Sequence, residues 1–171
     1  MRPVLHHDIK SANILLFKKP KSSVLVAKIA DFGASREADL ERTMETAGTP
    51  LFMAPELLRK ERYDKKVDVW SYACCVERLH SHAPLYAHAA DGREAEPDLE
   101  ALDKKEQLIV HRALAKKATD RYESCVAFAE ALRKAALSCW KILRLADPAS
   151  SPVRRLTAHA MRCRAFTAVS A

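Results

Sequence analysis

The run His-His-Asp-Ile-Lys-Ser-Ala-Asn at residues 6–13 constrains the fold of this chain more than any other segment. It places a carboxylate (Asp8), a cation (Lys10) and an amide (Asn13) on one short stretch. An apolar run at residues 14–17 follows at once and predicts a short β-strand. The combination indicates a functional loop, and the alternative for this segment taken alone is a solvated polar loop.

A predicted hairpin leads from this segment to two further motifs. Residues 24–29 predict a second strand, and the charged turn at residues 18–23 connects it to the first. The triplet Asp-Phe-Gly stands at residues 31–33, and residues 48–56 read Gly-Thr-Pro-Leu-Phe-Met-Ala-Pro-Glu. The three motifs in this order carry far more information than any one of them alone.

Together the motifs resemble the catalytic loop, the metal-binding Asp-Phe-Gly and the Ala-Pro-Glu end of the activation segment in protein kinases. The resemblance covers residues 4–133 and implies the larger, C-terminal lobe of a kinase domain, a mainly α fold with a small β hairpin. The spacing Asp-x-Lys-x-x-Asn is that of serine/threonine kinases, and the motif is closest to the tyrosine-kinase-like group.

The resemblance implies catalytic roles for Asp8, Lys10, Asn13 and Thr49. Asp8 would accept the proton of the substrate hydroxyl, and Lys10 would neutralise charge on the transferred phosphoryl group. Thr49 would hydrogen-bond near both side chains. The implied reaction transfers the γ-phosphoryl group of ATP to a serine or threonine hydroxyl of a protein substrate.

The implied cofactors are ATP and Mg²⁺. Asn13 and Asp31 would bind the metal ion through oxygen atoms. Leu15 would lie under the adenine, and Lys10 and Asn13 would also face the nucleotide. Six further residues would support the site structurally: His6, Phe32, Gly33, Glu56, Asp68 and Arg121. Among these, we expect a contact between Phe32 and His6 and a buried ion pair between Glu56 and Arg121.

Helices are expected at residues 57–60, 68–79, 101–115 and 124–145. Asp68 is expected to cap the second of these and to hold the catalytic loop from beneath. An apolar stripe at helical spacing marks core on the last helix: Cys125, Phe128, Ala129, Leu132, Ala136 and Trp140. Residues 34–46 predict a polar loop, and residues 87–97 a polar connector.

One departure from the family pattern bears on regulation. His7 stands where the family usually has arginine before the catalytic aspartate. A neutral imidazole does not hold a phosphate group as a bidentate guanidinium does. The substitution argues against activation by phosphorylation of the loop at residues 34–46.

The motifs of the smaller kinase lobe do not occur in this sequence. The three glycines cannot form a Gly-x-Gly-x-x-Gly loop, whereas ordinary usage would give about twelve glycines. No Val-Ala-x-Lys strand precedes His6. We therefore expect the N-terminal lobe to be missing and the isolated chain to transfer phosphate very weakly or not at all.

The expected organisation is a kinase lobe at residues 1–137, followed by residues 138–171 as the end of the last helix and a basic, disordered tail. The net charge is +7, and residues 148–171 hold four arginines and no acid. A tail that binds nucleic acid or an acidic membrane is an alternative. Aromatic residues are not interleaved with the basic ones, so we do not expect a nucleic-acid partner.

The remaining composition favours a reducing compartment, the cytoplasm, with the nucleus as the alternative. Five cysteines form no Cys-x-x-Cys pair and no zinc spacing, so they are expected to be free and buried. No apolar run is long enough to span a membrane, and no signal peptide is expected. A catalytically inactive lobe kept as a scaffold is the other functional reading, although a scaffold has no need of Asp8, Lys10, Asn13 and Asp31.

Overall fold

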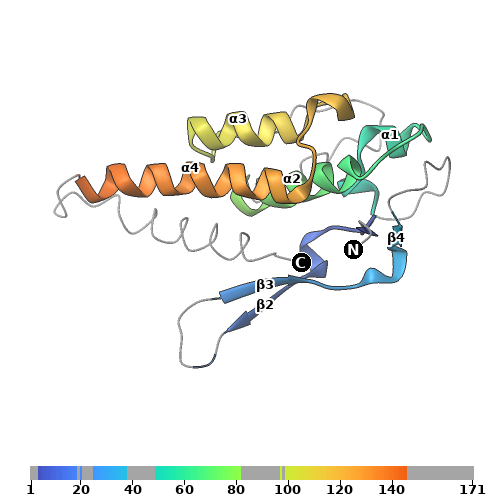
Figure 1. Ribbon diagram of the computed structural model, residues 1–171, viewed down its shortest axis with the longest axis horizontal. Coiled ribbons are helices and arrows are strands. Elements are labelled where there is room, and N and C mark those ends of the chain that lie inside the picture. The colour runs from blue at the N-terminus through green and yellow to red at the C-terminus, as the bar shows by residue number, and fades with distance from the viewer. Residues whose placement is uncertain are drawn as a thin grey trace.

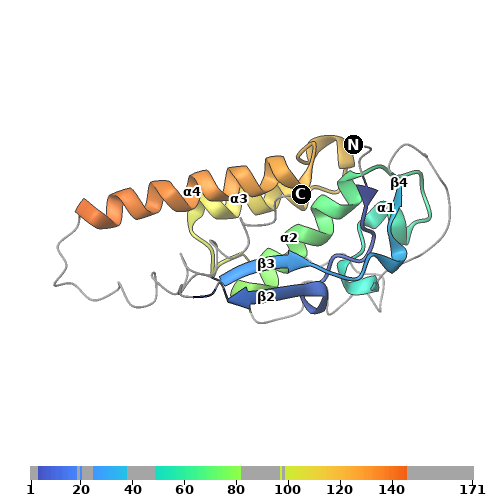
Figure 2. The same cartoon turned by 60° about the horizontal axis from the view of Figure 1, so that its bottom comes forward.

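The computed structural model describes residues 4–18, 20, 25–37, 49–81, 97 and 99–145. Within these residues the helices gather in one half of the molecule, and a hairpin of two longer strands projects from the other half (Figures 1 and 2). The elements are β1 (Val4–Leu5), β2 (Ile14–Lys18), β3 (Leu25–Ile29), β4 (Arg36–Glu37), α1 (Pro55–Leu58), α2 (Lys66–Ser81), α3 (Lys104–Ala113) and α4 (Cys125–Leu145). The predicted mainly helical fold with a small hairpin is confirmed.

The strands form two separate antiparallel pairs. The predicted hairpin is β2 with β3, whose register runs from Ile14 opposite Ile29 to Lys18 opposite Leu25. The second pair, β1 with β4, escaped prediction because two residues are too few to show an alternating pattern. This pair joins the residues just before the segment 6–13 to the residues just after Asp-Phe-Gly. Both motifs therefore lie between the two paired strands in sequence.

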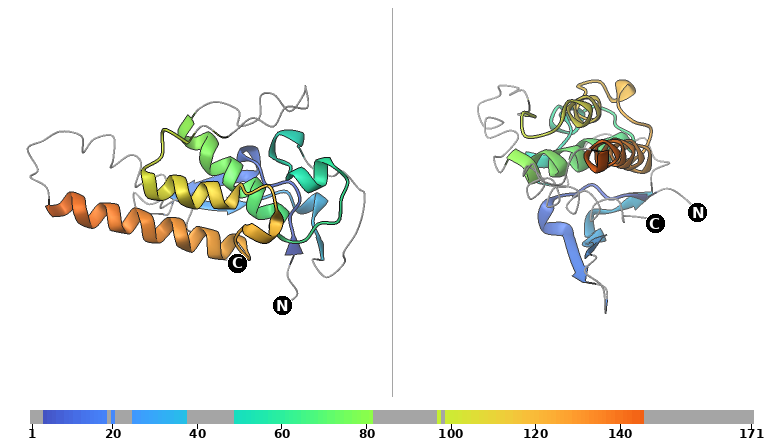
Figure 3. Two further views of the ribbon diagram at one scale, coloured as in Figure 1. Left: turned by 90° about the horizontal axis from the view of Figure 1, so that it is seen from above. Right: turned by 90° about the vertical axis from the view of Figure 1, so that its left-hand side faces the viewer.

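Helix α2 is the centre of the core. It packs against α3, α4 and the 3₁₀ turn Pro50–Phe52, and the three long helices lie side by side in the end-on view (Figure 3). Its residues from Val67 to Val76 are buried, as the apolar sequence predicts. The helix extends beyond the predicted range of 68–79 at both ends, because Lys66 already donates its amide to the Asp64 carboxylate at 2.8 Å.

The last two helices start at capping side chains. Asp103 accepts hydrogen bonds from the amides of Lys105 and Glu106, and the Glu106 side chain accepts one from the Asp103 amide. This capping box starts α3 at Lys104 rather than at the predicted residue 101. In α4 the predicted stripe forms core at Phe128 and Leu132, which are buried.

Several predicted features lie outside the described residues. These are the greater part of the polar loop at residues 34–46, Gly48, most of the connector at 87–97, and the basic tail. The Trp140 side chain lies outside them too. In the part of the chain that the structure describes, no helix has both the length and the apolar character needed to cross a membrane.

Helix α1 corrects a prediction, because it spans residues 55–58 rather than 57–60. Pro55 starts it with a preset backbone angle, and Lys60 ends it in the left-handed conformation, with φ of 58°. The Lys60 amide donates to the Leu57 carbonyl at 3.1 Å, and the Glu61 amide to the Glu56 carbonyl at 2.9 Å. These two bonds form a Schellman motif, in which glycine is the preferred residue at the position of Lys60.

Lys60→Gly is therefore expected to stabilise the chain. The left-handed conformation costs a residue with a Cβ roughly 1–2 kcal/mol, and part of that gain is offset by the greater freedom of glycine when unfolded. We expect a net increase of about 0.5–1 kcal/mol in the free energy of unfolding, measured by urea denaturation. Glu61→Gly is the matched control, because the φ of Glu61 is not positive, and it should destabilise. Equal effects of the two substitutions would contradict this account.

Candidate active site

The segment at residues 6–13 is fixed to the core by a carboxylate of α2. Both oxygens of Asp68 accept backbone hydrogen bonds, from the His6 amide at 2.7 Å and the His7 amide at 3.0 Å. Burial raises the pKa of Asp68, and these two hydrogen bonds oppose the shift. Asp68 lies two residues inside α2, so the predicted capping role is wrong, whereas the predicted contact with the backbone of residues 6–13 is present.

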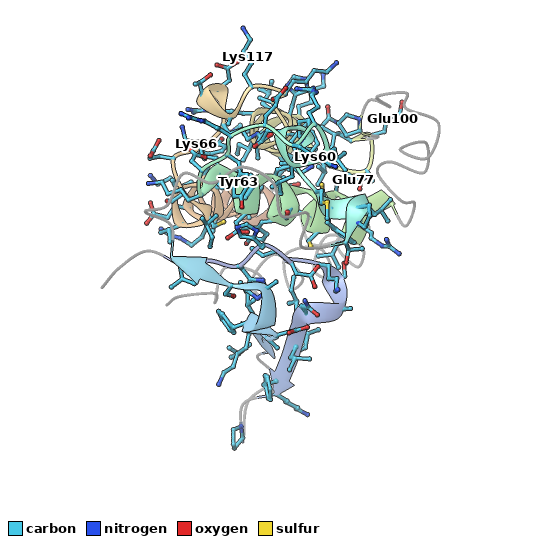
Figure 4. The ribbon with its side chains drawn as sticks, turned by 90° about the vertical axis from the view of Figure 1, so that its right-hand side faces the viewer. Lys60, Tyr63, Lys66, Glu77, Glu100 and Lys117 are labelled. Carbon is cyan, nitrogen blue, oxygen red and sulfur yellow. The ribbon has the colours of Figure 1, made fainter. Side chains whose placement is uncertain are left out.

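His7 is held in an uncommon conformation. Its φ is 68°, and its buried ring lies edge-on to the Tyr63 ring, with 5.2 Å between the centroids. Tyr63 precedes α2 and is labelled in Figure 4 between Lys60 and Lys66. The residue that replaces the usual arginine is thus packed against an aromatic ring.

The four predicted catalytic side chains converge on the Asp8 carboxylate. The amide and hydroxyl of Thr49 donate to Asp8 Oδ1 at 3.1 and 3.0 Å. Lys10 Nζ donates to Asp8 Oδ2 at 2.6 Å and Asn13 Nδ2 to the same oxygen at 3.1 Å. Lys10 also donates to the Thr49 hydroxyl at 3.0 Å. All four acceptor sites of the carboxylate are therefore used.

This network keeps Asp8 ionised. Burial acts to raise the pKa of Asp8, but the hydrogen bonds from Lys10, Thr49 and Asn13 and the charge of Lys10 outweigh it, so the pKa lies below its ordinary value. At neutral pH the side chain is a carboxylate, the form that can accept a proton or orient a hydroxyl.

The lowered pKa has a consequence for stability in acid. A carboxyl group whose pKa is lower in the folded than in the unfolded state stabilises the fold. The contribution is full at pH values above the unfolded-state pKa of about 3.9, and it is lost as the pH falls through the folded-state pKa. We expect the advantage of wild type over Asp8→Asn in unfolding free energy to be constant from pH 7 to about pH 5 and to shrink below about pH 4. Denaturant unfolding at several pH values measures it, and a difference that stayed constant into acid would contradict the stated cause.

His6 joins this segment to the one before Asp31. Its Nε2 lies 3.1 Å from the Ala30 carbonyl, and its Nδ1 accepts a hydrogen bond from the Asp8 amide at 3.3 Å. Together the two bonds assign the hydrogen of a neutral ring to Nε2. The ring also contacts that of Phe32, with 4.9 Å between centroids.

Two oxygen donors meet where a metal ion is implied. The Ala30 amide donates to the Asn13 carbonyl at 2.8 Å, which brings Asp31 beside Asn13. The Asn13 amide nitrogen is used by Asp8, so its Oδ1 is the atom left for a ligand. The Asp31 carboxylate is exposed and accepts a 3.3 Å hydrogen bond from the Gly33 amide. These hard oxygen donors fit Mg²⁺, which usually keeps several waters and takes few protein ligands.

The backbone of Asp31 lies in the left-handed region, with φ of 63°. Its carboxylate accepts from Gly33 at the start of the 3₁₀ turn Phe32–Ala34, and a Cβ added to Gly33 would lie 3.2 Å from Asp31 Oδ1. A side chain at position 33 would therefore press on the carboxylate that is implied to bind the metal.

The apolar surface implied for adenine is open. Leu15 is 45% exposed, and its neighbours on β2, Leu16 and Phe17, are exposed as well. Phe32 is also exposed, although it contacts His6. Leu15 and Phe17 lie on one face of β2 and Leu16 on the other, and no element of the described residues buries these side chains.

Glu56 and Arg121 form the expected buried pair. Arg121 Nη1 and Nη2 donate to the two Glu56 oxygens at 2.6 and 2.8 Å. The remaining guanidinium hydrogens are donated to three backbone carbonyls, those of Ala115, Lys66 and Lys116. The ring of Trp70 lies 5.0 Å from the guanidinium carbon. This pair fixes the end of the segment that carries Thr49 to the helical core.

Two hydroxyl groups that hold the site were missed from sequence. Ser71 Oγ donates to the Phe52 carbonyl at 2.7 Å, which fixes the 3₁₀ turn after Thr49 to α2. Ser11 hydrogen-bonds the buried Cys75 thiol, whose pKa burial raises to about 12. No local signal marks either serine, because each partner lies far away in sequence.

The structure is a mainly helical lobe with an aspartate, a lysine and an asparagine on one loop beside Asp-Phe-Gly. This is the arrangement of the protein kinases, the class that the motifs resemble. Comparison with known proteins agrees, since the model of the protein kinase domain family matches residues 1–160. The chain belongs to the protein kinase domain family.

Individual relatives are serine/threonine kinases. The chain is 40% identical over 85 residues to serine/threonine-protein kinase 4 homolog A of Dictyostelium discoideum. The matched segment is 48% of this chain and 17% of the relative. It is 40% identical over 80 residues to serine/threonine-protein kinase Nek5 of Mus musculus, with 46% and 12% covered. It is 35% identical over 91 residues to mitogen-activated protein kinase kinase kinase 17 of Arabidopsis thaliana, with 53% and 23% covered. The matched segments are thus less than a quarter of these relatives.

Proposed function

We propose that this chain takes part in transfer of the ATP γ-phosphoryl group to serine or threonine hydroxyls of a protein. The observation that carries the proposal is the convergence of Lys10, Asn13 and Thr49 on the Asp8 carboxylate. The bond between Lys10 and Thr49 supports a serine/threonine specificity, as do the relatives. We further propose that the chain is closest to the tyrosine-kinase-like group, and the motif at residues 6–16 supports this proposal.

Asp8 acts by orientation. ATP would supply the phosphoryl group, and Asn13 and Asp31 would hold Mg²⁺, which would neutralise charge on that group. The substrate hydroxyl needs an acceptor site on Asp8, and all four are used in the structure. Lys10 has a flexible stem, so it is the group that leaves Asp8 and turns toward the phosphoryl oxygens. The hydroxyl then bonds to Asp8 Oδ2, which aligns its oxygen for attack on the γ-phosphorus and takes its proton, while the bond from that phosphorus to the bridging oxygen breaks and ADP leaves.

The experiment uses the protein that carries this chain, captured whole with an antibody against residues 148–171. It is incubated with Mg²⁺, labelled ATP and a protein mixture, and the labelled amino acids are identified after hydrolysis. We expect label on serine and threonine and none on tyrosine. No label above that of an Asp8→Asn protein captured in the same way would overturn the proposal.

The chain alone is expected to bind nucleotide weakly. Leu15 and Phe17 share one face of β2 and offer it to an adenine ring, and no described element supplies the opposite side of the ring. A nucleotide held on one side buries less apolar surface, and affinity falls accordingly. Titration of the purified chain with a fluorescent ATP analogue measures this, and submillimolar binding would refute it.

A further inference from the structure

We propose that Arg78 selects substrates with an acidic side chain close to the phosphorylated serine or threonine. The inference rests on the proposed function and adds to it a class of substrate. It is carried by the position of Arg78 beside the turn that follows Thr49, by its exposure, and by the lack of a carboxylate partner in the described part of the chain.

Arg78 lies over the segment next to the reacting hydroxyl. Its guanidinium carbon is 5.8 Å from the centroid of the Phe52 ring. The Arg78 side chain is exposed, whereas Glu77 before it, labelled on α2 in Figure 4, is only 1% exposed. The charge of Arg78 therefore faces solvent beside Phe52, which belongs to the turn packed against α2.

Phe52 is joined to the catalytic residues by short bonds. It ends the 3₁₀ turn whose N-cap is Thr49, and its amide donates to the Thr49 carbonyl at 2.9 Å. The Thr49 hydroxyl lies 3.0 Å from Asp8 Oδ1, and the other oxygen of the same carboxylate is the one that would orient the substrate hydroxyl. Ser71 fixes the Phe52 carbonyl from α2, so the ring under Arg78 keeps its place relative to Asp8.

A second contact places Arg78 on the same side of α2 as the catalytic loop. Cys75 hydrogen-bonds Ser11, which directly follows Lys10 in sequence. Residues at i and i+3 share one face of a helix, so Arg78 lies one turn beyond Cys75 on that face. The guanidinium thus borders the turn after Thr49, on the face of α2 where Cys75 contacts Ser11.

The chemistry of this position suits a carboxylate. None of the ion pairs among the described residues includes Arg78. A guanidinium presents a planar set of donors that matches a carboxylate in two bonds, and the aromatic ring beneath it limits its motion. Lys10 is paired with Asp8 and is assigned to the phosphoryl group in our proposal, so it does not compete with Arg78 for a substrate carboxylate.

The test uses two fluorescent peptides with one serine each, identical except for glutamate or lysine at the positions flanking that serine. Their binding to the whole chain is measured by anisotropy at low and moderate salt. We expect wild type to bind the glutamate peptide about fivefold more tightly, with the preference reduced by salt. Arg78→Gln should remove the preference, and Arg78→Glu should reverse it.

The control is Arg112→Glu. Arg112 is also exposed and stacked on an aromatic ring, with 4.5 Å between its guanidinium carbon and the Tyr122 centroid, but it belongs to α3. This variant should keep the wild-type preference.

Equal binding of both peptides, binding of neither, or a preference that survives Arg78→Gln overturns the inference. Phosphorylation of both peptides is followed with the captured whole protein. If both peptides are phosphorylated at the same rate, the role of Arg78 is rejected and the proposed function stands. If the glutamate peptide binds more tightly but neither peptide is phosphorylated, the proposed function is rejected and the role of Arg78 in binding stands.

Discussion

Asp8→Asn is expected to lower phosphoryl transfer by about 10²–10⁴-fold, because the amide cannot accept the proton of the substrate hydroxyl. The change preserves size and keeps one oxygen for the Thr49 bonds, so the local geometry should be largely retained. The lost charge also leaves Lys10 without its ion-pair partner. Initial rates of label transfer by the captured wild-type and variant proteins measure the effect.

Asp120→Asn is the control for that measurement. It is an equally conservative change at an exposed carboxylate, which accepts a bond from Thr119 and takes no part in the network around Asp8. It should keep full activity. If Asp8→Asn retained more than about a tenth of the wild-type rate, the assignment of Asp8 as the group that orients and deprotonates the hydroxyl would be wrong.

Arg121→Met is expected to lower the free energy of unfolding by about 3–5 kcal/mol. The substitution keeps an apolar chain of similar length but leaves the Glu56 carboxylate buried and unpaired. It also removes the donors to the carbonyls of Ala115, Lys66 and Lys116. Arg121→Lys should be only partly tolerated, because an ammonium has three donors and cannot form the two parallel bonds to Glu56.

Urea denaturation of the whole chain measures these changes. Glu61→Gln serves as the control, since Glu61 faces Arg59 at 3.8 Å in an exposed pair and its loss should change stability by less than about 1 kcal/mol. The double variant Arg121→Met with Glu56→Leu should be less destabilised than the sum of the single changes, because no isolated charge remains buried. A small effect of Arg121→Met, like that of Glu61→Gln, would show that the pair is not a structural anchor.

The polar chemistry of the site could be predicted because its residues occur in short local motifs. Asp8, Lys10 and Asn13 lie within one loop, and the hairpin that follows is visible from apolar runs. Element boundaries were less predictable. The capping box at Asp103 and the left-handed Lys60 moved the ends of α3 and α1, since a single side-chain bond or backbone angle decides where a helix begins or ends.

The amino-acid sequence by itself determined which polar groups the candidate site contains, because the motifs keep an aspartate, a lysine, an asparagine and Asp-Phe-Gly in a fixed order. Only the tertiary structure decided that Ser71 fixes the turn at Phe52 and that Arg78 lies above that turn. The physical reason is that these contacts join segments far apart in the chain, and helix packing brings them together without any local pattern to mark them.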